Sequence, residues 1–177
     1  FELNADEKGT ALRAAHLCKA DLVTNMVIEM TSVQGIMGRY YALNSGETPQ
    51  VADAIFEHYL PRTTGDRTAD SMPGLLVGLA DRLDSLVGLF AAGLAPTGAK
   101  DPFAQRRTAL GLVQMLMEKD LELDLTDALA MAAEQQPIEV SQTNLHECMA
   151  FITGRLRSLL IEQGYRYDIV DAICARQ

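Results

Sequence analysis

The chain has 177 residues, of which 48% are hydrophobic and 22% charged, and its formal net charge at pH 7 is −9. This composition is typical of a packed globular domain and excludes intrinsic disorder. The negative charge argues against a protein that coats nucleic acid non-specifically, although a local basic patch is compatible with it. No apolar run reaches the roughly 20 residues that a bilayer-spanning helix needs, so we expect a soluble chain. Because it begins at Phe1 without a methionine or a signal-like segment, we expect a piece of a longer protein.

Apolar residues recur at helical spacing along almost the whole chain, and no stretch alternates as a half-buried strand does. The sequence therefore predicts an all-α fold. One helix, or two broken near Thr31, is expected over 6–30, with an apolar stripe of Leu12, Ala15, Cys18, Leu22 and Met26. Another helix is expected over 33–43. The next begins after Thr48, which can cap it, with Pro49 at the first helical position.

The middle of the chain contains its most polar and its most apolar segments. Residues 61–71 are predicted to form a loop, and the apolar helix over 72–93 is the candidate for the centre of the core. A further helix is expected to start at Asp101, which can cap it, with Pro102 in its first turn, and to end near Glu118.

The C-terminal part is predicted to contain three more helices, over 125–135, 145–163 and 167–175. Asn144 gives the second of these a start that resembles a capping box, and Gly164 ends it. We place a soft boundary near residue 120, between a first helical bundle and a smaller helical segment.

The three cysteines, Cys18, Cys148 and Cys174, are far apart and show no C-x-x-C spacing. This pattern fits reduced thiols in a cytosolic protein better than a disulfide framework or a zinc site. We expect them to act as small, buried apolar side chains.

Metal-dependent hydrolysis is the first enzyme class to consider, because His and Asp side chains from several helices can converge on a metal ion. The histidines of the chain are only His16, His58 and His146. None lies in an H-E-x-x-H pair, which presents two ligands from one helix face. A core or surface role is therefore favoured for each of them.

Asp81 and Asp84 interrupt the most apolar helix and share one of its faces. Carboxylates in such a position need partners, because burying an unpaired charge is costly. Either they belong to a metal site, or Asp81 pairs with Arg82, Lys19 or another cation. Nucleophilic catalysis has weaker support, since the chain has no G-x-S-x-G elbow and no Walker-type phosphate loop.

The run from Pro96 to Gly111 carries more positive charge than the capping of a helix requires. Lys100, Arg106 and Arg107 are candidate phosphate contacts, since arginine presents a planar fork of donors to phosphate. Neighbouring arginines on a helix point about 100° apart, so at most one of them is expected to be buried. A solvated charged face is the alternative. Cations elsewhere that can add to such a surface are Arg62, Arg67, Arg155 and Arg157.

Six segments together carry a family pattern. They read LCKADLVTNMV at 17–27, VQGIMGRYYA at 33–42, EHYLP at 57–61, LADRLDSLVG at 79–88, PTGAKDPFAQRR at 96–107 and RLRSLLIEQGYRYDIVDA at 155–172. In this order, and over almost the whole chain, they resemble the β subunit of the bacterial-type heterotetrameric glycyl-tRNA synthetase. Each segment alone is an ordinary helix, and their combination is specific.

The resemblance implies a segment from the middle of a longer β subunit. It implies an HD-like helical domain over 1–120 and the truncated start of a following helical region over 121–177. In that family the α subunit of an α2β2 assembly activates glycine with ATP and Mg, and the β subunit recognises and positions tRNA. The implied partners are glycine tRNA, the α subunit and the remaining β-subunit domains, in the cytoplasm and without a membrane.

The HD superfamily builds a metal site from a His, a His-Asp pair and a distant Asp. The resemblance puts Lys19-Ala20-Asp21 at the place of the pair and Asp81 at the distant position. Asp21 and Asp81 are thus degenerate metal positions, and no catalytic residue, metal or cofactor is expected in this segment. The function implied is a non-catalytic module that binds tRNA through Lys100, Arg106 and Arg107. The alternative is a metal-dependent HD-type phosphohydrolase that uses Asp21, Asp81 and His16 or His58.

Overall fold

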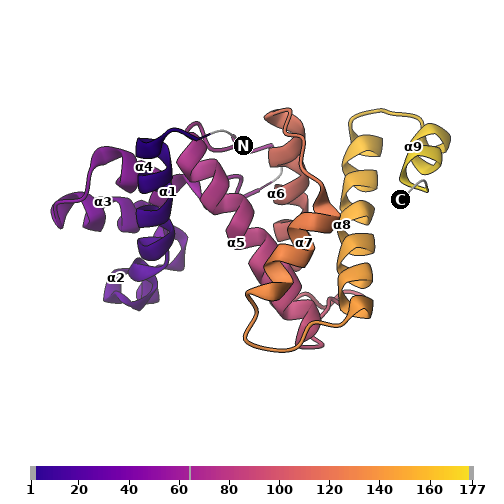
Figure 1. The fold of residues 1–177 in the computed structure, drawn as a ribbon, viewed down its shortest axis with the longest axis horizontal. Helices are drawn as coiled ribbons and strands as arrows, with labels where there is room; N and C mark the ends of the chain where they lie inside the picture. The colour runs from indigo at the N-terminus through magenta and orange to yellow at the C-terminus, as the bar shows by residue number, and fades with distance from the viewer. Residues whose placement is uncertain (1–2, 64, 176–177) are drawn as a thin grey trace. The chain divides into compact units, whose positions relative to one another are not determined.

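The computed structural model describes residues 3–63 and 65–175 (Figure 1). Over these residues the regular elements are helices, and the isolated β-bridge between Thr97 and Lys100 belongs to a turn. The prediction of an all-α fold is confirmed. The chain divides into two compact units, Phe1–Asp81 and Arg82–Gln177. No helix in the described ranges is long and apolar enough to cross a membrane.

The first unit is built from short helices. It contains α1 (Ala5–Leu17), the 3₁₀ helix η1 (Ala20–Val23), α2 (Asn25–Glu29), η2 (Thr31–Val33), α3 (Ile36–Asn44), α4 (Pro49–Glu57) and the first half of α5 (Met72–Ala91). Helix α4 contacts both α1 and α3. Their shared core consists of small and branched side chains: Ala14, Cys18, Ala42, Val51, Ala52, Ala54, Ile55 and Val77. Thr48 caps α4 and Pro49 occupies its first turn, as predicted.

The region 6–30 is not one continuous helix, and the stripe predicted for it is wrong. Helix α1 ends at Leu17, and η1 and α2 follow separately. Leu12 is 64% exposed, whereas Ala14 and Cys18 are buried with Ala11 packed against their cluster. The stripe assumed that the helical phase continues beyond Cys18, where α1 is in fact capped. Small side chains, not Leu12, face α4.

The second unit contains the rest of α5 with α6 (Gln105–Glu118), α7 (Leu125–Glu134), α8 (Gln142–Glu162) and α9 (Tyr167–Cys174). Helix α8 contacts α6, α7 and α9 (Figure 1). The core contains Leu86, Val87, Leu112, Met115, Leu129, Cys148 and Ile152. The boundary between these compact units falls within α5, and α6 packs on α8 within the second unit. The domain boundary expected near residue 120 stays a prediction. The assignment of an HD-like domain to 1–120 stays a prediction.

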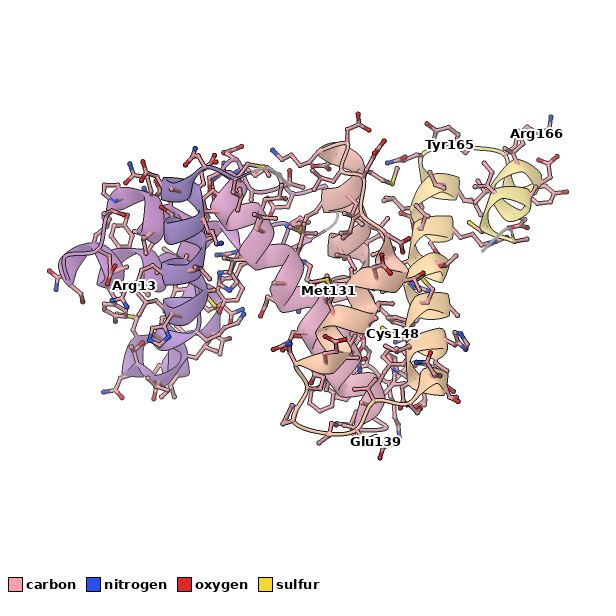
Figure 2. The ribbon with its side chains drawn as sticks, viewed as in Figure 1. Arg13, Met131, Glu139, Cys148, Tyr165 and Arg166 are labelled. Atoms are coloured by element: carbon pink, nitrogen blue, oxygen red, sulfur yellow. The ribbon has the colours of Figure 1, made fainter. Side chains whose placement is uncertain are left out.

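Helix α8 begins at Gln142 instead of Leu145, because Ser141 is its cap. Ser141 and Asn144 form the two halves of a capping box, and the Asn144 side chain also donates to the Phe90 carbonyl. Asn144 therefore occupies the N3 position of the capping box, and Ser141 is the N-cap. Helix α8 ends before Gly164, as predicted. Tyr165 and Arg166 lie at the connection that follows, leading into α9 (Figure 2).

Candidate functional site

The loop between α5 and α6, residues 94–104, carries the cationic run predicted from the sequence. At its tip Thr97 and Lys100 exchange backbone hydrogen bonds, with N–O distances of 3.1 and 2.9 Å. Gly98 has φ 52°, a left-handed conformation that glycine adopts without strain. Gly98 and Ala99 are thus the centre of a tight turn, which places Lys100 at a defined position.

Asp101 caps α6, but from a greater distance than the sequence predicts. Its carboxylate accepts hydrogen bonds from the backbone N–H groups of Gln105, at 2.8 Å, and Arg106, at 2.9 Å. Helix α6 begins only at Gln105, so the prediction that Pro102 lies in its first turn is wrong. Residues 101–104 form a turn instead, closed by the Ala104 N–H donating to the Asp101 carbonyl at 3.2 Å.

Gln105 and Arg106 hold the loop through its carbonyl oxygens. The Gln105 side chain is buried and its Nε2 donates to the Leu94 carbonyl at 2.6 Å. The Arg106 Nη2 donates to the Gly98 carbonyl at 2.6 Å, and its Nη1 lies 4.0 Å from the Asp101 carboxylate. Arg106 is half-buried, and part of its charge is balanced inside the loop. These contacts tie the loop to the first turn of α6.

Lys100 and Arg107 differ from Arg106 because both are exposed. Over residues 3–63 and 65–175 the structure gives neither side chain an ion pair or hydrogen bond. The neighbouring arginines thus point to different surroundings, as the helical geometry predicts. The exposed side chains of Lys100 and Arg107 are available to a ligand, whereas the Arg106 side chain contacts the loop. The binding role of all three stays a prediction.

The other candidate cations are engaged within the protein. Arg62 donates to the Gln34 carbonyl at 3.0 Å, and Arg67 pairs with Asp70. Arg157 pairs with Asp171 at 2.5 Å and links α8 to α9. The Arg155 guanidinium lies 5.6 Å from the centre of the Phe151 ring. These arginines stabilise their own units, so their side chains would have to leave partners to bind phosphate.

A polar cluster in the first unit gathers residues from three of the sequence segments that carry the family pattern. The Lys19 ammonium lies 3.0 Å from His58 Nε2 and 3.0 Å from Asp81 Oδ2. It also lies 4.4 Å from the centre of the Tyr59 ring. The sequence analysis allowed two partners for Asp81, a metal ion or a positively charged side chain. In the structure its partner is the Lys19 side chain.

Asp21 is almost fully buried, but its carboxylate serves the start of α3. Oδ2 accepts hydrogen bonds from the backbone N–H groups of Gly35, at 2.6 Å, and Gly38, at 3.2 Å. A carboxylate at a helix N-terminus satisfies free N–H groups and interacts favourably with the helix dipole. These hydrogen bonds give Asp21 a structural role.

The pKa of the Tyr59 hydroxyl is raised by burial, together with the charges of Asp21 and Asp81.

The arrangement does not fit a metal-dependent phosphohydrolase. Among the described residues no group of three or more His, Cys, Asp or Glu side chains is placed to hold a metal ion. His58 Nε2 and the Asp81 carboxylate face an ammonium, and Asp21 binds the start of α3. His16 and His146 are exposed on α1 and α8. The geometry therefore does not support the phosphohydrolase alternative.

The cysteines are free, and two of them are buried as predicted. Cys148 lies on α8 with no exposed surface (Figure 2), and burial raises the pKa of its thiol to about 12. Burial also raises the pKa of Cys18, which the neighbouring Lys19 charge partly opposes. Cys174 is partly exposed, so the prediction of burial is wrong for it. It is the last residue of α9.

The fold and these clusters define an all-α protein with an ordered cationic loop and a lysine that bridges a histidine and an aspartate. The chain belongs to the glycyl-tRNA synthetase β subunit family, whose model matches residues 2–175. It is 46% identical to the glycine–tRNA ligase β subunit of Syntrophomonas wolfei over 168 residues, which cover 93% of this chain and 24% of that protein.

Other relatives agree. The chain is 49% identical to the glycine–tRNA ligase β subunit of Moorella thermoacetica, over 92% of this chain and 24% of that protein. It is 50% identical to that of Aromatoleum aromaticum, over 93% of this chain and 24% of that protein. The chain therefore spans about a quarter of the length of the curated relatives it matches.

Proposed function

We propose that the chain is a segment of the β subunit of a glycine–tRNA ligase and acts as a non-catalytic module that binds and positions tRNA. Family membership supports the assignment to the ligase. The activity of the complete enzyme is part of the proposal: ATP- and Mg-dependent glycylation of glycine tRNA in the cytoplasm. So are its partners, an α subunit in an α2β2 assembly and the remaining domains of the β subunit.

The observation that best supports the tRNA role is the pair of exposed cations at the start of α6: Lys100 in the loop before it and Arg107 in its first turn. Both side chains are exposed, while the backbone beneath Lys100 is fixed by the turn that it forms with Thr97. A preformed site loses less conformational entropy on binding than a mobile one. Lysine and arginine bind phosphate through charge-assisted hydrogen bonds. We infer that these two residues contact the tRNA backbone.

Arg106 acts differently in this account. Its guanidinium holds the Gly98 carbonyl and lies near Asp101, so it orders the loop that presents Lys100. It is a positioning residue, and its replacement acts on tRNA binding through the conformation of the loop.

The overall charge limits what the module does alone. A net charge of −9 disfavours approach of an RNA polyanion, so a small cationic loop gives weak binding by itself. We expect useful affinity only in the complete ligase, where other parts of the enzyme hold the rest of the tRNA.

The test is tRNA binding by the complete ligase with Lys100→Ala, Arg107→Ala or both in the β subunit. We expect the double variant to raise the tRNA dissociation constant on the order of tenfold. Formation of glycyl-adenylate, measured by pyrophosphate exchange into ATP, should be unchanged. Lys8→Ala is the matched control for each single variant, because Lys8 is exposed on α1 and its loss removes the same one positive charge.

A second outcome separates binding from docking. If Lys100 and Arg107 attach this segment to neighbouring domains, the double variant lowers the melting temperature of the ligase and leaves the tRNA dissociation constant unchanged. That result would overturn the phosphate role and leave the family assignment intact.

A further inference from the structure

Lys19 occupies a position at which two side chains of the metal-ligand type converge. His58 Nε2 and Asp81 Oδ2 each lie 3.0 Å from Lys19 Nζ. Imidazole nitrogen and carboxylate oxygen are common ligands of Zn²⁺ and related ions. Lys19 directly precedes η1, His58 directly follows α4, and Asp81 lies in the middle of α5; all three belong to the first unit.

The hydrogen bonds of His58 define which of its nitrogens faces the ammonium with a lone pair. Nδ1 lies 2.6 Å from the Ile55 carbonyl oxygen, which can only accept, so Nδ1 carries the proton. An ammonium has only donors, so Nε2 must accept from Lys19 as a neutral imidazole. This is the tautomer in which histidine binds a metal through Nε2, with its other nitrogen fixed by a carbonyl.

The surroundings explain why the ammonium is stable there. The Tyr59 ring offers a face 4.4 Å from Lys19, and a cation over an aromatic ring is attracted by the ring electrons. Gly35 lets this ring lie close, because a Cβ at that position would be 2.4 Å from a ring carbon of Tyr59. Asp21 is directed to the backbone of Gly35 and Gly38 and does not add a ligand.

From this geometry we propose that the Lys19 ammonium is a built-in cation that stands in for a metal ion at His58 and Asp81. It neutralises Asp81 and, unlike a bound metal ion, it cannot dissociate from the chain. The cluster therefore joins three chain segments without needing a metal. The proposal concerns the first unit and is independent of the tRNA role of Lys100 and Arg107.

A histidine at position 19 should convert the cluster into a metal site. A metal bound through a histidine lies about 2.1 Å beyond its ring nitrogen, so it reaches about as far from the backbone as a lysine nitrogen does. Lys19→His would therefore bring a third ligand to a metal placed near the present ammonium. Lys19→Ala removes the ammonium and leaves only His58 and Asp81 as ligands. Its affinity for metal should therefore be lower than that of Lys19→His.

The test is titration of the 177-residue chain with Co²⁺ alone at pH 7.5, followed by visible absorption and melting temperature. Lys19→His should bind one equivalent of Co²⁺ at least tenfold more tightly than the wild type and melt at a higher temperature with Co²⁺ than without. The matched control, Lys19→His with Asp81→Asn, should lose this gain because one ligand is removed. The wild type should show no Co²⁺-dependent change in melting temperature.

Several outcomes would overturn the proposal. A wild type that binds Co²⁺ as tightly as the variant would show that the ammonium does not hold the site. A folded Lys19→His variant without a gain in affinity, or with a gain that persists after Asp81→Asn, would also overturn it. If Lys19→His is unfolded without metal, Co²⁺ should restore its helical circular dichroism, and failure to do so counts against the proposal.

Discussion

The guanidinium of Arg106 donates a hydrogen bond to the carbonyl oxygen of Gly98, 2.6 Å away, and so joins the first turn of α6 to the tip of the loop before it. Its neighbour Arg107 is exposed. Two adjacent residues of the same type thus have different surroundings, which predicts different consequences of their removal.

Arg106→Ala should lower the free energy of unfolding by about 1 kcal/mol, because a charge-assisted hydrogen bond is lost and the side chain is partly exposed. Arg107→Ala should change it by less than about 0.5 kcal/mol, as is usual for an exposed side chain without partners. Urea unfolding of both variants measures the difference. Equal effects of the two replacements would contradict the assignment of Arg106 as the residue that orders the loop.

Ala104 precedes α6 with φ 54°, a left-handed conformation that costs an alanine about 1 kcal/mol. Ala104→Gly removes this cost and adds entropy to the unfolded chain, so the net change in stability should lie between zero and about 1 kcal/mol of stabilisation. Ala130→Gly is the control. Because Ala130 is exposed inside α7, this replacement should destabilise by about 1 kcal/mol. A loss of stability in Ala104→Gly as large as in the control would contradict the observed backbone conformation.

The ion pair between Arg157 and Asp171 predicts how the contact of α8 with α9 depends on pH. The hydrogen bond from Arg157 lowers the pKa of the Asp171 carboxyl below its ordinary value. A lowered folded-state pKa means that the contribution to stability is present above the ordinary pKa of aspartate and is lost as the pH falls through the folded-state value.

NMR titration of the Asp171 side-chain carboxyl measures this shift. Arg157→Gln should raise the pKa of Asp171, since the cation is removed and the amide is a weaker partner. High salt should reduce the shift in the wild type, because both side chains are exposed. An Asp171 pKa that is the same in both proteins would show that the two side chains do not interact in solution.

The thiols should react in an order set by burial. Cys148 has a pKa of about 12 and no exposed surface, and burial raises the pKa of Cys18 as well, so few of their thiols are ionised at pH 8. We expect an aromatic disulfide reagent to modify Cys174 first, because it is partly exposed. Mass spectrometry of the modified peptides gives the order, and modification of Cys148 as fast as of Cys174 would contradict the packing of α8.

The sequence predicts elements whose signals are local. Thr48 caps α4 and Pro49 is its first residue, and the apolar spacing of α5 extends over its whole length, so the predicted bounds of both helices are nearly correct. The Asp101 carboxylate accepts hydrogen bonds from the first N–H groups of α6, as a capping residue does, but the N-cap position is Ala104, because the extra turn over 101–104 has no distinct residue pattern. The start of α8 was misplaced because Ser141 and Asn144 are both good capping residues, and only the backbone shows which is outside the helix.

The candidate site was only partly predictable. Lys100, Arg106 and Arg107 together indicate a cationic surface. The partner of Arg106, however, is a backbone carbonyl, and because every residue has one, the residue types do not predict this contact. Lys19 contacts His58 and Asp81, which are 39 and 62 residues away in the sequence. A local sequence pattern therefore cannot predict this cluster. The pairing of Asp81 with Lys19 was one alternative among several, and tertiary packing decides between them.

If Lys100 and Arg107 contact tRNA phosphates, as we propose, their loss should change the salt dependence of tRNA binding by the complete ligase. Each phosphate contact contributes about one unit to the slope of log affinity against log salt concentration. The ligase with Lys100→Ala and Arg107→Ala should therefore show a slope shallower by about 1.5 to 2 units than the wild type, with unchanged glycyl-adenylate formation. A slope equal to that of the wild type, in a double variant with an unchanged melting temperature, would contradict the claim.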